Sequence, residues 1–276
     1  MSGSVNLATK YSSKLDQLFT AGSYTDRYVN KKYDFTGAKT VEVYTVTTVT
    51  PGNYDRTATG DRFGGNNELQ DVVTPYTISN DKSFKIAIDD GNYEQGALAK
   101  KAGEVMRAEM EEQVIPMIDA NRLAKAAAGA TAVSQATTYT NDAYGSVLAS
   151  SAFLDEAKAP IAGRVLWVTP GFYNAIKKEI TTTVHADGYN DKLIGRGFVG
   201  ELDGIPVVKV PTSYFPAKTD AIMIHRDALL GVDQIKTTRI ISDSELVDGK
   251  VLVGRFIYDS FVLNGKKNAV ASIIHA

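Results

Sequence analysis

Cysteine is missing from the sequence, and histidine is scarce. With no cysteine among 276 residues, disulfide bonds, thiolate zinc sites and cysteine nucleophiles are excluded. The only histidines are His185, His225 and His275, and they are scattered along the chain. The longest apolar runs, such as Val165 to Val168, are far too short to span a bilayer. The sequence therefore shows no sign of thiol chemistry or of a membrane span.

Neither sign of charge dominates the composition. Lysine and arginine number 30 against 32 aspartates and glutamates, which gives a formal net charge of −2 and a pI of about 6.0. The chain therefore has no overall basic field for nucleic acid. Its 43% apolar and 22% charged residues are ordinary for a folded protein of one large or two moderate domains. Met1 to Val5 contain no basic-then-apolar leader, so we expect no secretion signal.

Catalytic and cofactor motifs are also lacking. Gly195 to Gly200 matches G-x-G-x-x-G, but a dinucleotide site needs that motif between a strand and a helix. Gly204 and Pro206 rule out the helix, so we expect a glycine-rich turn. No P-loop, zinc-protease, serine-hydrolase or EF-hand motif occurs. We predict a protein that is not an enzyme, with no catalytic residue, cofactor or metal site.

What the sequence does have is a long extended arm, at about Lys31 to Asp90. Thr40 to Thr50 is rich in β-branched residues and predicts a strand. Leu69 to Ile78 predicts a second strand, in which Pro75 favours an edge position. Asn53 to Asn67, between them, consists largely of turn-forming residues. An arm with so polar a tip is too long to be buried by its own domain, which points to contact with a neighbouring copy.

One long helix follows the arm. Tyr93 to Ala128 carries apolar residues at steps of three and four. Pro116 lies far inside it and predicts a bend, or an end with a second helix starting at Met117. Gly129 is a candidate C-cap.

Beyond the long helix the pattern becomes a mixture of helices and strands, so the expected fold class is α+β. Thr131 to Thr140 is rich in serine, threonine and alanine and marks a candidate domain boundary. Expected strands are Phe84 to Ile88, Arg164 to Val168, Ile205 to Val210, Ala221 to Ile224, Thr238 to Ile241, Val251 to Tyr258 and Asn268 to Ile274. Expected helices are Tyr144 to Ala159 and Gly171 to Glu179, and Thr181 to Asn190 is expected to be a loop.

The N-terminal residues have two interpretations. Residues 5–19 place apolar side chains at helical spacing, and irregular polar chain is expected from there through Lys32. The short helix either packs on its own domain or forms an arm that docks on a neighbouring copy.

Several segments, taken in order, resemble the major capsid proteins of tailed bacteriophages. Phe35 to Tyr44 resembles the entry to the extended loop (E-loop) of that family, and Asp81 to Asp89 resembles the return from it into the family's long spine helix. Val165 to Tyr173 resembles a strand that leads through Thr-Pro into a helix. Gly200 to Val208 resembles the family's G-x-x-x-G-x-P-V-V hairpin. Together these segments cover nearly the whole chain.

The resemblance implies an architecture with named parts. These are an N-terminal arm (1–30), the E-loop with flanking peripheral-domain strands (31–90), the spine helix (91–130), an axial domain (131–237) and returning peripheral-domain strands (238–276). It also implies hexamers and pentamers that form an icosahedral virion shell around double-stranded DNA, assembled in the host bacterial cytoplasm. The implied partners are further copies of the chain, a separate scaffolding protein, a portal, possible decoration proteins and non-specifically bound DNA, with no membrane.

Two alternatives stay open at the level of sequence. Encapsulin nanocompartments share the fold, so the shell could enclose a protein cargo. The chain could also be an intracellular oligomeric enzyme whose β arm serves oligomerisation.

Charged residues in the arm and on the long helix are the candidate contacts between subunits. Arginines at the tip could meet glutamates on the helix of the next copy, or both groups could simply be solvated. The residues concerned are Arg56, Asp61 and Arg62 in the tip and Glu109, Glu111 and Glu112 on the helix.

Overall fold

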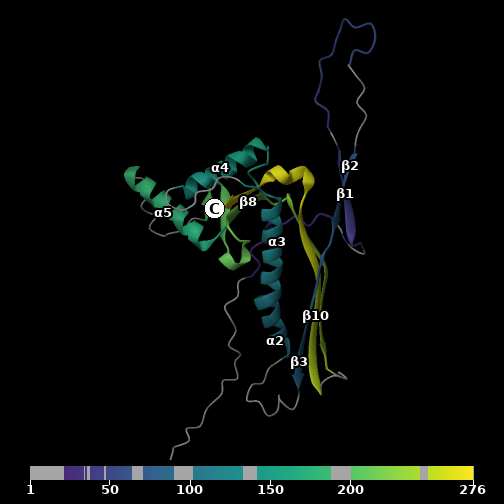
Figure 1. The fold of residues 1–276 in the computed structure, drawn as a ribbon, viewed down its shortest axis with the longest axis vertical. Helices are drawn as coiled ribbons and strands as arrows, with labels where there is room; N and C mark the ends of the chain where they lie inside the picture. The colour runs from purple at the N-terminus through teal and green to yellow at the C-terminus, as the bar shows by residue number, and fades with distance from the viewer. Residues whose placement is uncertain are drawn as a thin grey trace, which may run out of the picture. The chain divides into compact units, whose positions relative to one another are not determined.

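The computed structural model describes residues 22–33, 35, 38–46, 48–63, 71–89, 102–132, 142–187, 200–242 and 248–275. The chain divides into two compact units: Phe35–Ile78, called the hairpin unit, and the body, made of Met1–Asp34 and Ser79–Ala276. Figure 1 shows their helices and strands. The helix expected at residues 5–19, the start of the long helix before Ala102 and most of the candidate boundary at 131–140 lie outside the described residues.

A mixed six-stranded sheet forms one part of the body. β5 and β7 are parallel, because a helix connects β5 to the rest of the sheet, while β8 runs antiparallel to both of its neighbours. β5 is buried throughout, as its unbroken apolar run predicts. The strand order is β4 (Thr131–Ala132), β11 (Val270–Ile274), β8 (Thr219–His225), β5 (Arg164–Val168), β7 (Ile205–Lys209) and β6 (Glu201–Leu202).

Helices cover both faces of this sheet. Leu166 and Val168 of β5 point into a core shared with α4 (Ala143–Glu156) and α5 (Pro170–Asp187). The alternating Trp167 points into a second core, shared with α3 (Ile115–Gly129) and the described N-terminal residues. The alternation follows from the two-residue period of a strand. Both sides of β5 are therefore dry, which explains its composition.

A three-stranded antiparallel sheet forms the other part of the body. β10 (Gly249–Val262) is its central strand, between β3 (Asn80–Asp89) and β9 (Leu229–Ile241). A continuous helical run packs against it, made of α2 (Ala102–Glu109), a π-helical turn (Met110–Val114) and α3. Figure 1 shows this run alongside β10.

The packing of this sheet confirms the alternation predicted for β3. Phe84, Ile86 and Ile88 are half-buried, and the residues between them are exposed. Phe84 stacks on Phe256 of β10 with ring centroids 6.0 Å apart, and both contact the core around Val114 of the helix.

Four expectations about the body need correction. β9 begins at Leu229, not Thr238, because its first half pairs with the end of β10. α5 continues to Asp187 through the stretch expected as a loop, since β-branched residues reduce helix propensity by only tenths of a kcal/mol each. β11 begins at Val270, after a 3₁₀ turn (Asn264–Ala269).

The fourth correction concerns Gly129. It ends α3 as expected, but the following residue, Ala130, is extended (φ −79°, ψ 151°), and Gly129 does not adopt a left-handed backbone. A Cβ at position 129 would lie 2.6 Å from Cγ2 of Val262. Glycine is therefore required by the close approach of α3 to β10, and not by helix capping.

The hairpin unit is a two-stranded antiparallel ribbon. β1 (Thr40–Val46) pairs with β2 (Asp71–Thr77), with Thr40 opposite Thr77. β1 ends at Val46 and does not continue to Thr50. Pro75 lies in a strand that has a partner on only one side, as its missing N–H predicts.

Candidate intersubunit surfaces

One face of the hairpin ribbon exposes apolar side chains. Tyr44 lies opposite Val73, and Val46 lies two residues further along β1. Residues directly opposite and residues two apart share a face, so these three side chains form one apolar face. Their exposed fractions are 64%, 42% and 53% for Tyr44, Val73 and Val46. Exposed apolar clusters of this kind mark interaction surfaces.

Both strands of the ribbon are also edge strands within the described residues, where β1 and β2 pair only with each other. Native proteins usually cover or charge such edges.

The tip of the hairpin is organised by its own contacts. The amide of Asp55 donates to the carbonyl of Arg62 (3.0 Å). The Asp55 carboxylate accepts from the Thr57 hydroxyl (2.7 Å) and amide (2.8 Å), which lowers the pKa of Asp55. Tyr54 packs edge-to-face on Phe63 with centroids 5.0 Å apart. Phe63 is nevertheless 83% exposed, so the tip presents an aromatic ring that the charge-based prediction left out.

The three charged tip residues predicted from the sequence behave differently from one another. Nε of Arg62 donates to the carbonyl of Ala58 (3.2 Å), and the carboxylate of Asp61 accepts from the amide of Phe63 (3.0 Å). Arg56 is exposed. Asp61 and Arg62 thus help to shape the loop, whereas Arg56 points its charge to the surface.

The three glutamates predicted on the long helix are half-buried. Glu111 accepts a hydrogen bond from Nε of Arg107, one turn earlier, at 2.7 Å. This hydrogen bond and the charge of Glu111 raise the pKa of Arg107. Glu111 therefore already has a partner within the helix. A contact of Glu109, Glu111 and Glu112 with Arg56, Asp61 or Arg62 of another copy stays a prediction.

Helical backbone continues through Pro116, with an irregularity just before it. Met110–Val114 is π-helical, and Pro116 is in the first turn of α3. Proline lacks an N–H and crowds the preceding turn, and a wider turn accommodates such a residue. The alternative that the helix ends at Pro116 is wrong. A bend at Pro116 stays a prediction.

Residues 22–33, the N-terminal segment, dock on their own chain through a buried carboxylate. Asp119 of α3 is fully buried and accepts from the hydroxyls of Ser23 and Thr25 (both 2.6 Å) and from the amide of Tyr24 (2.8 Å). These three hydrogen bonds offset the cost of burying the charge. The chain expected to be irregular here is therefore held against the side of α3 by these hydrogen bonds.

Arg122, one turn further along α3, binds the same segment. Its guanidinium lies 3.1 Å from Asp26 and 3.3 Å from Asp233 of β9. Burial opposes ionisation of Asp26, but the hydrogen bond from Lys31 and the charge of Arg122 outweigh it and lower the pKa of Asp26. Sequence reasoning missed this cluster. Its one available signal was a pair of charged residues, Asp119 and Arg122, at core positions of the helical stripe.

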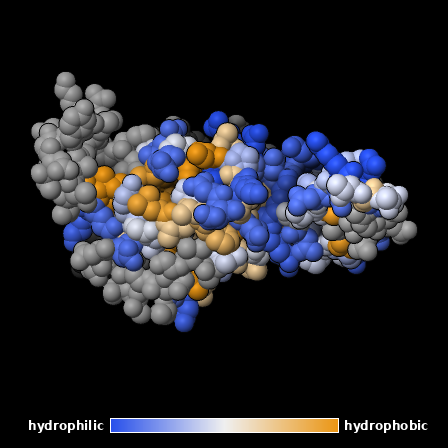
Figure 2. Space-filling model, turned by 90° about the horizontal axis from the view of Figure 1, so that it is seen from above, coloured by the Kyte–Doolittle hydropathy of each residue, from blue (hydrophilic) through white to orange (hydrophobic). Residues whose placement is uncertain are grey.

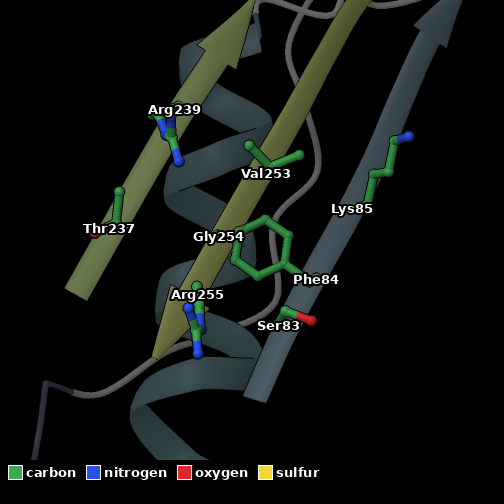
Figure 3. Close-up of a pocket in the computed structure, with 8 residues that line it drawn as sticks. All are labelled: Ser83, Phe84, Lys85, Thr237, Arg239, Val253, Gly254 and Arg255. Carbon is green, nitrogen blue, oxygen red and sulfur yellow. The ribbon is translucent and has the colours of Figure 1, made fainter. Parts of the chain in front are cut away.

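A basic depression of about 590 Å³ lies on the three-stranded sheet. Val253 of β10 is flanked by Lys85 and Arg239 on the neighbouring strands, so the two cations share one face (Figure 3). Arg255, two residues along, makes a two-bond ion pair with Asp81 (3.0 and 2.6 Å). The depression can attract anionic groups, but it contains no acid–base pair with a catalytic geometry.

The segment that follows the G-x-G-x-x-G motif is a tight hairpin. β6 pairs with β7 through Asp203 (φ +52°) and Gly204 (φ +71°), which is the geometry of a two-residue hairpin turn. Gly195 to Val199 lie outside the described residues, so the glycine-rich turn expected at the motif stays a prediction, while the residues after Gly200 form strands and not the helix that a dinucleotide site needs.

The two histidines with described side chains occupy structural positions. Nε2 of His225 lies 3.0 Å from the carbonyl of Ala162, and its Nδ1 accepts from the amide of Asp227. His275 lies 2.9 Å from the carboxylate of Asp220. Among the described residues, no group of three metal-ligating side chains is found and no helix could cross a bilayer.

Apolar side chains also reach the surface of the body. Tyr144 and Leu148 of α4 are exposed and lie one turn apart. Figure 2 shows apolar residues gathered in patches among hydrophilic ones. The apolar hairpin face, the hairpin tip, the basic depression and these patches are the candidate contact surfaces.

The fold is that of bacteriophage capsid proteins. A structure from Mycobacterium phage Che8 matches with a TM-score of 0.76 and 19% sequence identity, over 97% of each chain. The capsid structure of cyanophage P-SCSP1u matches with a TM-score of 0.77 and 15% identity, over 99% of this chain and 93% of that one. The mature capsid of bacteriophage PhiM1 matches with a TM-score of 0.74 and 11% sequence identity, over 98% of this chain and 92% of that one.

These matches confirm the capsid fold that the sequence resemblance implies. They extend over nearly the whole chain, so the hairpin unit and the body both belong to the shared fold. No protein-family model matches the chain, and no curated protein sequence is detectably similar to it.

Proposed function

We propose that this chain is the major structural protein of a phage capsid, which assembles into hexamers and pentamers of an icosahedral shell around double-stranded DNA. The observation that carries the proposal is the full-length match to phage capsid structures. The exposed apolar face of the hairpin unit supports it, because a shell of identical subunits offers each hairpin a neighbour to cover that face.

Electron microscopy and sedimentation of the purified chain, with and without a co-expressed scaffolding protein, test this proposal. We expect closed particles of megadalton mass. A chain that stays monomeric at high concentration in the presence of scaffold would contradict the function, although the fold would stand.

The hairpin unit should be the part that a shell cannot lose. We assign it to the E-loop of the capsid fold. Thr40 and Thr77 are opposite each other, and their hydroxyls are 2.8 Å apart, so residues 41–76 can be replaced by a two-residue Gly-Gly turn. We expect a folded body that does not form shells. Normal shells from this deletion would remove the assigned role of the hairpin.

Charged residues at the hairpin tip should set register between copies, with acidic residues on the helix as their partners. Exposed ion pairs contribute only about 0–1 kcal/mol each, but a shell repeats each contact many times. Replacing both Arg56 and Arg62 with glutamate should leave a folded chain that assembles poorly. Glu109→Lys with Glu112→Lys should restore part of the assembly.

Contact with DNA should be weak and independent of sequence. The chain is slightly acidic, with a net charge of −2. Contacts between a few lysines or arginines and DNA phosphates weaken steeply as the salt concentration rises. Binding of random and phage-derived duplexes should be equally weak and should disappear between 50 and roughly 200 mM salt. High-affinity binding to one sequence would contradict this expectation.

We infer a structural and not a catalytic role for the body. Its titratable clusters join the N-terminal segment, the sheets and the helices to one another, as Asp119 and Arg122 do.

Finding DNA inside the particle would favour a capsid over an encapsulin-like compartment, which would contain protein cargo. A separate scaffolding protein, a portal and decoration proteins complete the proposed set of partners.

A further inference from the structure

The first residue of the body after the hairpin unit, Ser79, is held by two hydrogen bonds. The hairpin unit ends at Ile78, and the next residue, Ser79, gives two hydrogen bonds to one carboxylate oxygen of Asp259. Its amide lies 2.9 Å and its hydroxyl 2.7 Å from Oδ2. Two bonds to one residue restrict both its position and its orientation.

The second oxygen of Asp259 contacts its own strand and α3. Oδ1 accepts from the amide of Ser260 at 2.8 Å and lies 3.6 Å from Nζ of Lys125 on α3. The side chain of Asp259 has no exposed surface. These four residues, Asp259, Ser79, Ser260 and Lys125, are called the Asp259 clasp.

The strand around Asp259 does not follow a regular burial pattern. The register between β10 and β9 shifts between Ile257 and Tyr258, because β9 contains one extra residue, Gln234, at this point. Tyr258, Asp259 and Ser260 are all buried in succession, which regular alternation does not allow for a strand with one wet face. The Asp259 carboxylate therefore lies inside, next to Ser79, the residue that precedes β3.

An isolated buried carboxylate is costly, and three hydrogen bonds together with the ammonium group of Lys125 offset that cost. The same contacts join three elements at one point, because Ser79 directly precedes β3, Asp259 belongs to β10 and Lys125 belongs to α3. A group that served only to fill space would be apolar at this position.

We propose that the Asp259 clasp is an anchor that fixes the direction in which the hairpin unit leaves the body. The chain is held at Ser79 by β10 and α3 together, so reorientation of the hairpin takes place beyond Ser79 and does not disturb β3. Loosening the clasp widens the range of hairpin directions. This property belongs to the single chain and does not rest on the proposed shell.

Pulsed electron paramagnetic resonance on the unassembled full-length chain tests the anchor. The chain has no cysteine, so Thr59→Cys in the tip and Ala152→Cys on α4, both exposed positions, give two unique sites for spin labels. The measured quantity is the width of the distance distribution between the labels.

We expect the distribution to broaden in Ser79→Ala, which loses one of the two bonds to Oδ2, and to broaden further in Asp259→Asn. Asparagine has one acceptor oxygen and an NH₂ group that cannot accept, so it can serve Ser79 or Ser260 but not both. The matched control is Asp81→Asn, which removes a carboxylate two residues from Ser79 whose partner Arg255 is exposed.

An unchanged width in Ser79→Ala, with native circular dichroism, would overturn the proposal, as would an equal broadening in the Asp81→Asn control. If Asp259→Asn does not fold, Ser79→Ala decides the outcome, because it removes only a hydroxyl.

Discussion

At the scale of single residues, two glycines in the helical run have opposite environments. Gly129 faces Val262, and an added Cβ would overlap that side chain, whereas a Cβ at Gly103 in α2 would have no atom of another described element within 4 Å. We expect Gly129→Ala to destabilise the chain by about 1–3 kcal/mol, since overpacking forces neighbours to move. Gly103→Ala should stabilise it by about 0.5–1 kcal/mol. Urea unfolding measures both.

Val262 provides a check on the cause. Gly129→Ala combined with Val262→Ala removes the overlap, so the double variant should lose less stability than the sum of the two single variants. Strict additivity of the two changes would show that the glycine is needed for another reason.

Acid should release the N-terminal segment. Burial opposes the ionisation of both Asp26 and Asp227. Lys31 and Arg122 nevertheless lower the pKa of Asp26 below 3.8. In the same way, Lys32, Lys266 and His225 lower the pKa of Asp227 below 3.8. A carboxyl that is more acidic in the folded chain contributes stability above pH 3.8. That contribution is lost as pH falls from 3.8 through the lowered value.

The single tryptophan reports this release. Trp167 donates a hydrogen bond to the carbonyl of Tyr24 (3.3 Å) and packs against Tyr28. Its fluorescence emission should therefore change as the pH falls below about 4, before the far-UV circular dichroism signal is lost. Asp26→Asn with Asp227→Asn should remove this early change, and the control Asp81→Asn should retain it. An early change that persists in the double variant would count against the two carboxyls.

Buried charges were the residues that sequence reasoning could not place. Asp119 and Asp259 each accept hydrogen bonds from chain segments about 95 and 180 residues away in sequence. No local pattern encodes such partners, because they meet only after the sheets have formed. The sequence pointed instead to exposed charges at the hairpin tip, whose contacts with another copy the single chain does not display.

At the scale of elements, Pro116 and the π-helical turn before it form one unit. Proline costs about 3 kcal/mol in a regular helix interior because it removes a hydrogen bond and clashes with the preceding turn, and we expect the wider π-helical turn to relieve only part of that cost. We expect Pro116→Ala to raise the melting temperature of the unassembled chain. If the helix has to change curvature in a shell, the same variant should give fewer or misshapen particles by electron microscopy. A lower melting temperature would show that the proline is well accommodated.

Strands with a strong local pattern were predictable, and strands defined by their partners were not. β5 is an unbroken buried run and β3 alternates, so both follow directly from hydrophobic period. The first half of β9 contains Gly231, where a Cβ would come within 3.0 Å of Val29. Glycine weakens a strand pattern, so the sequence did not reveal that the N-terminal segment packs there.

At the scale of the whole molecule, the apolar face of the hairpin should control assembly without controlling folding. Tyr44 is 64% exposed on that face, and the adjacent Thr45 is exposed on the opposite face. We expect Tyr44→Lys to prevent shell formation with little change in unfolding free energy, because a charge replaces apolar surface that a neighbour would cover. Thr45→Lys is the matched control and should assemble normally. Equal effects of the two variants would mean that the face carries no special role.

The order of segments made the fold predictable as a whole. An extended arm that returns into a long helix, followed by a helix–strand domain and final returning strands, agrees with the capsid fold that the structure shows. Individual boundaries were less predictable, because helix ends and strand starts depend on contacts such as that between α3 and β10.

The pairing of the hairpin has a consequence for size. Side chains on a strand repeat every two residues, so adding two residues to each of β1 and β2 keeps every apolar residue on its face, while adding one reverses the faces. Each addition of two residues per strand lengthens the ribbon by about 6.8 Å. The length of a hairpin that keeps its apolar face can therefore change only in fixed steps and not continuously.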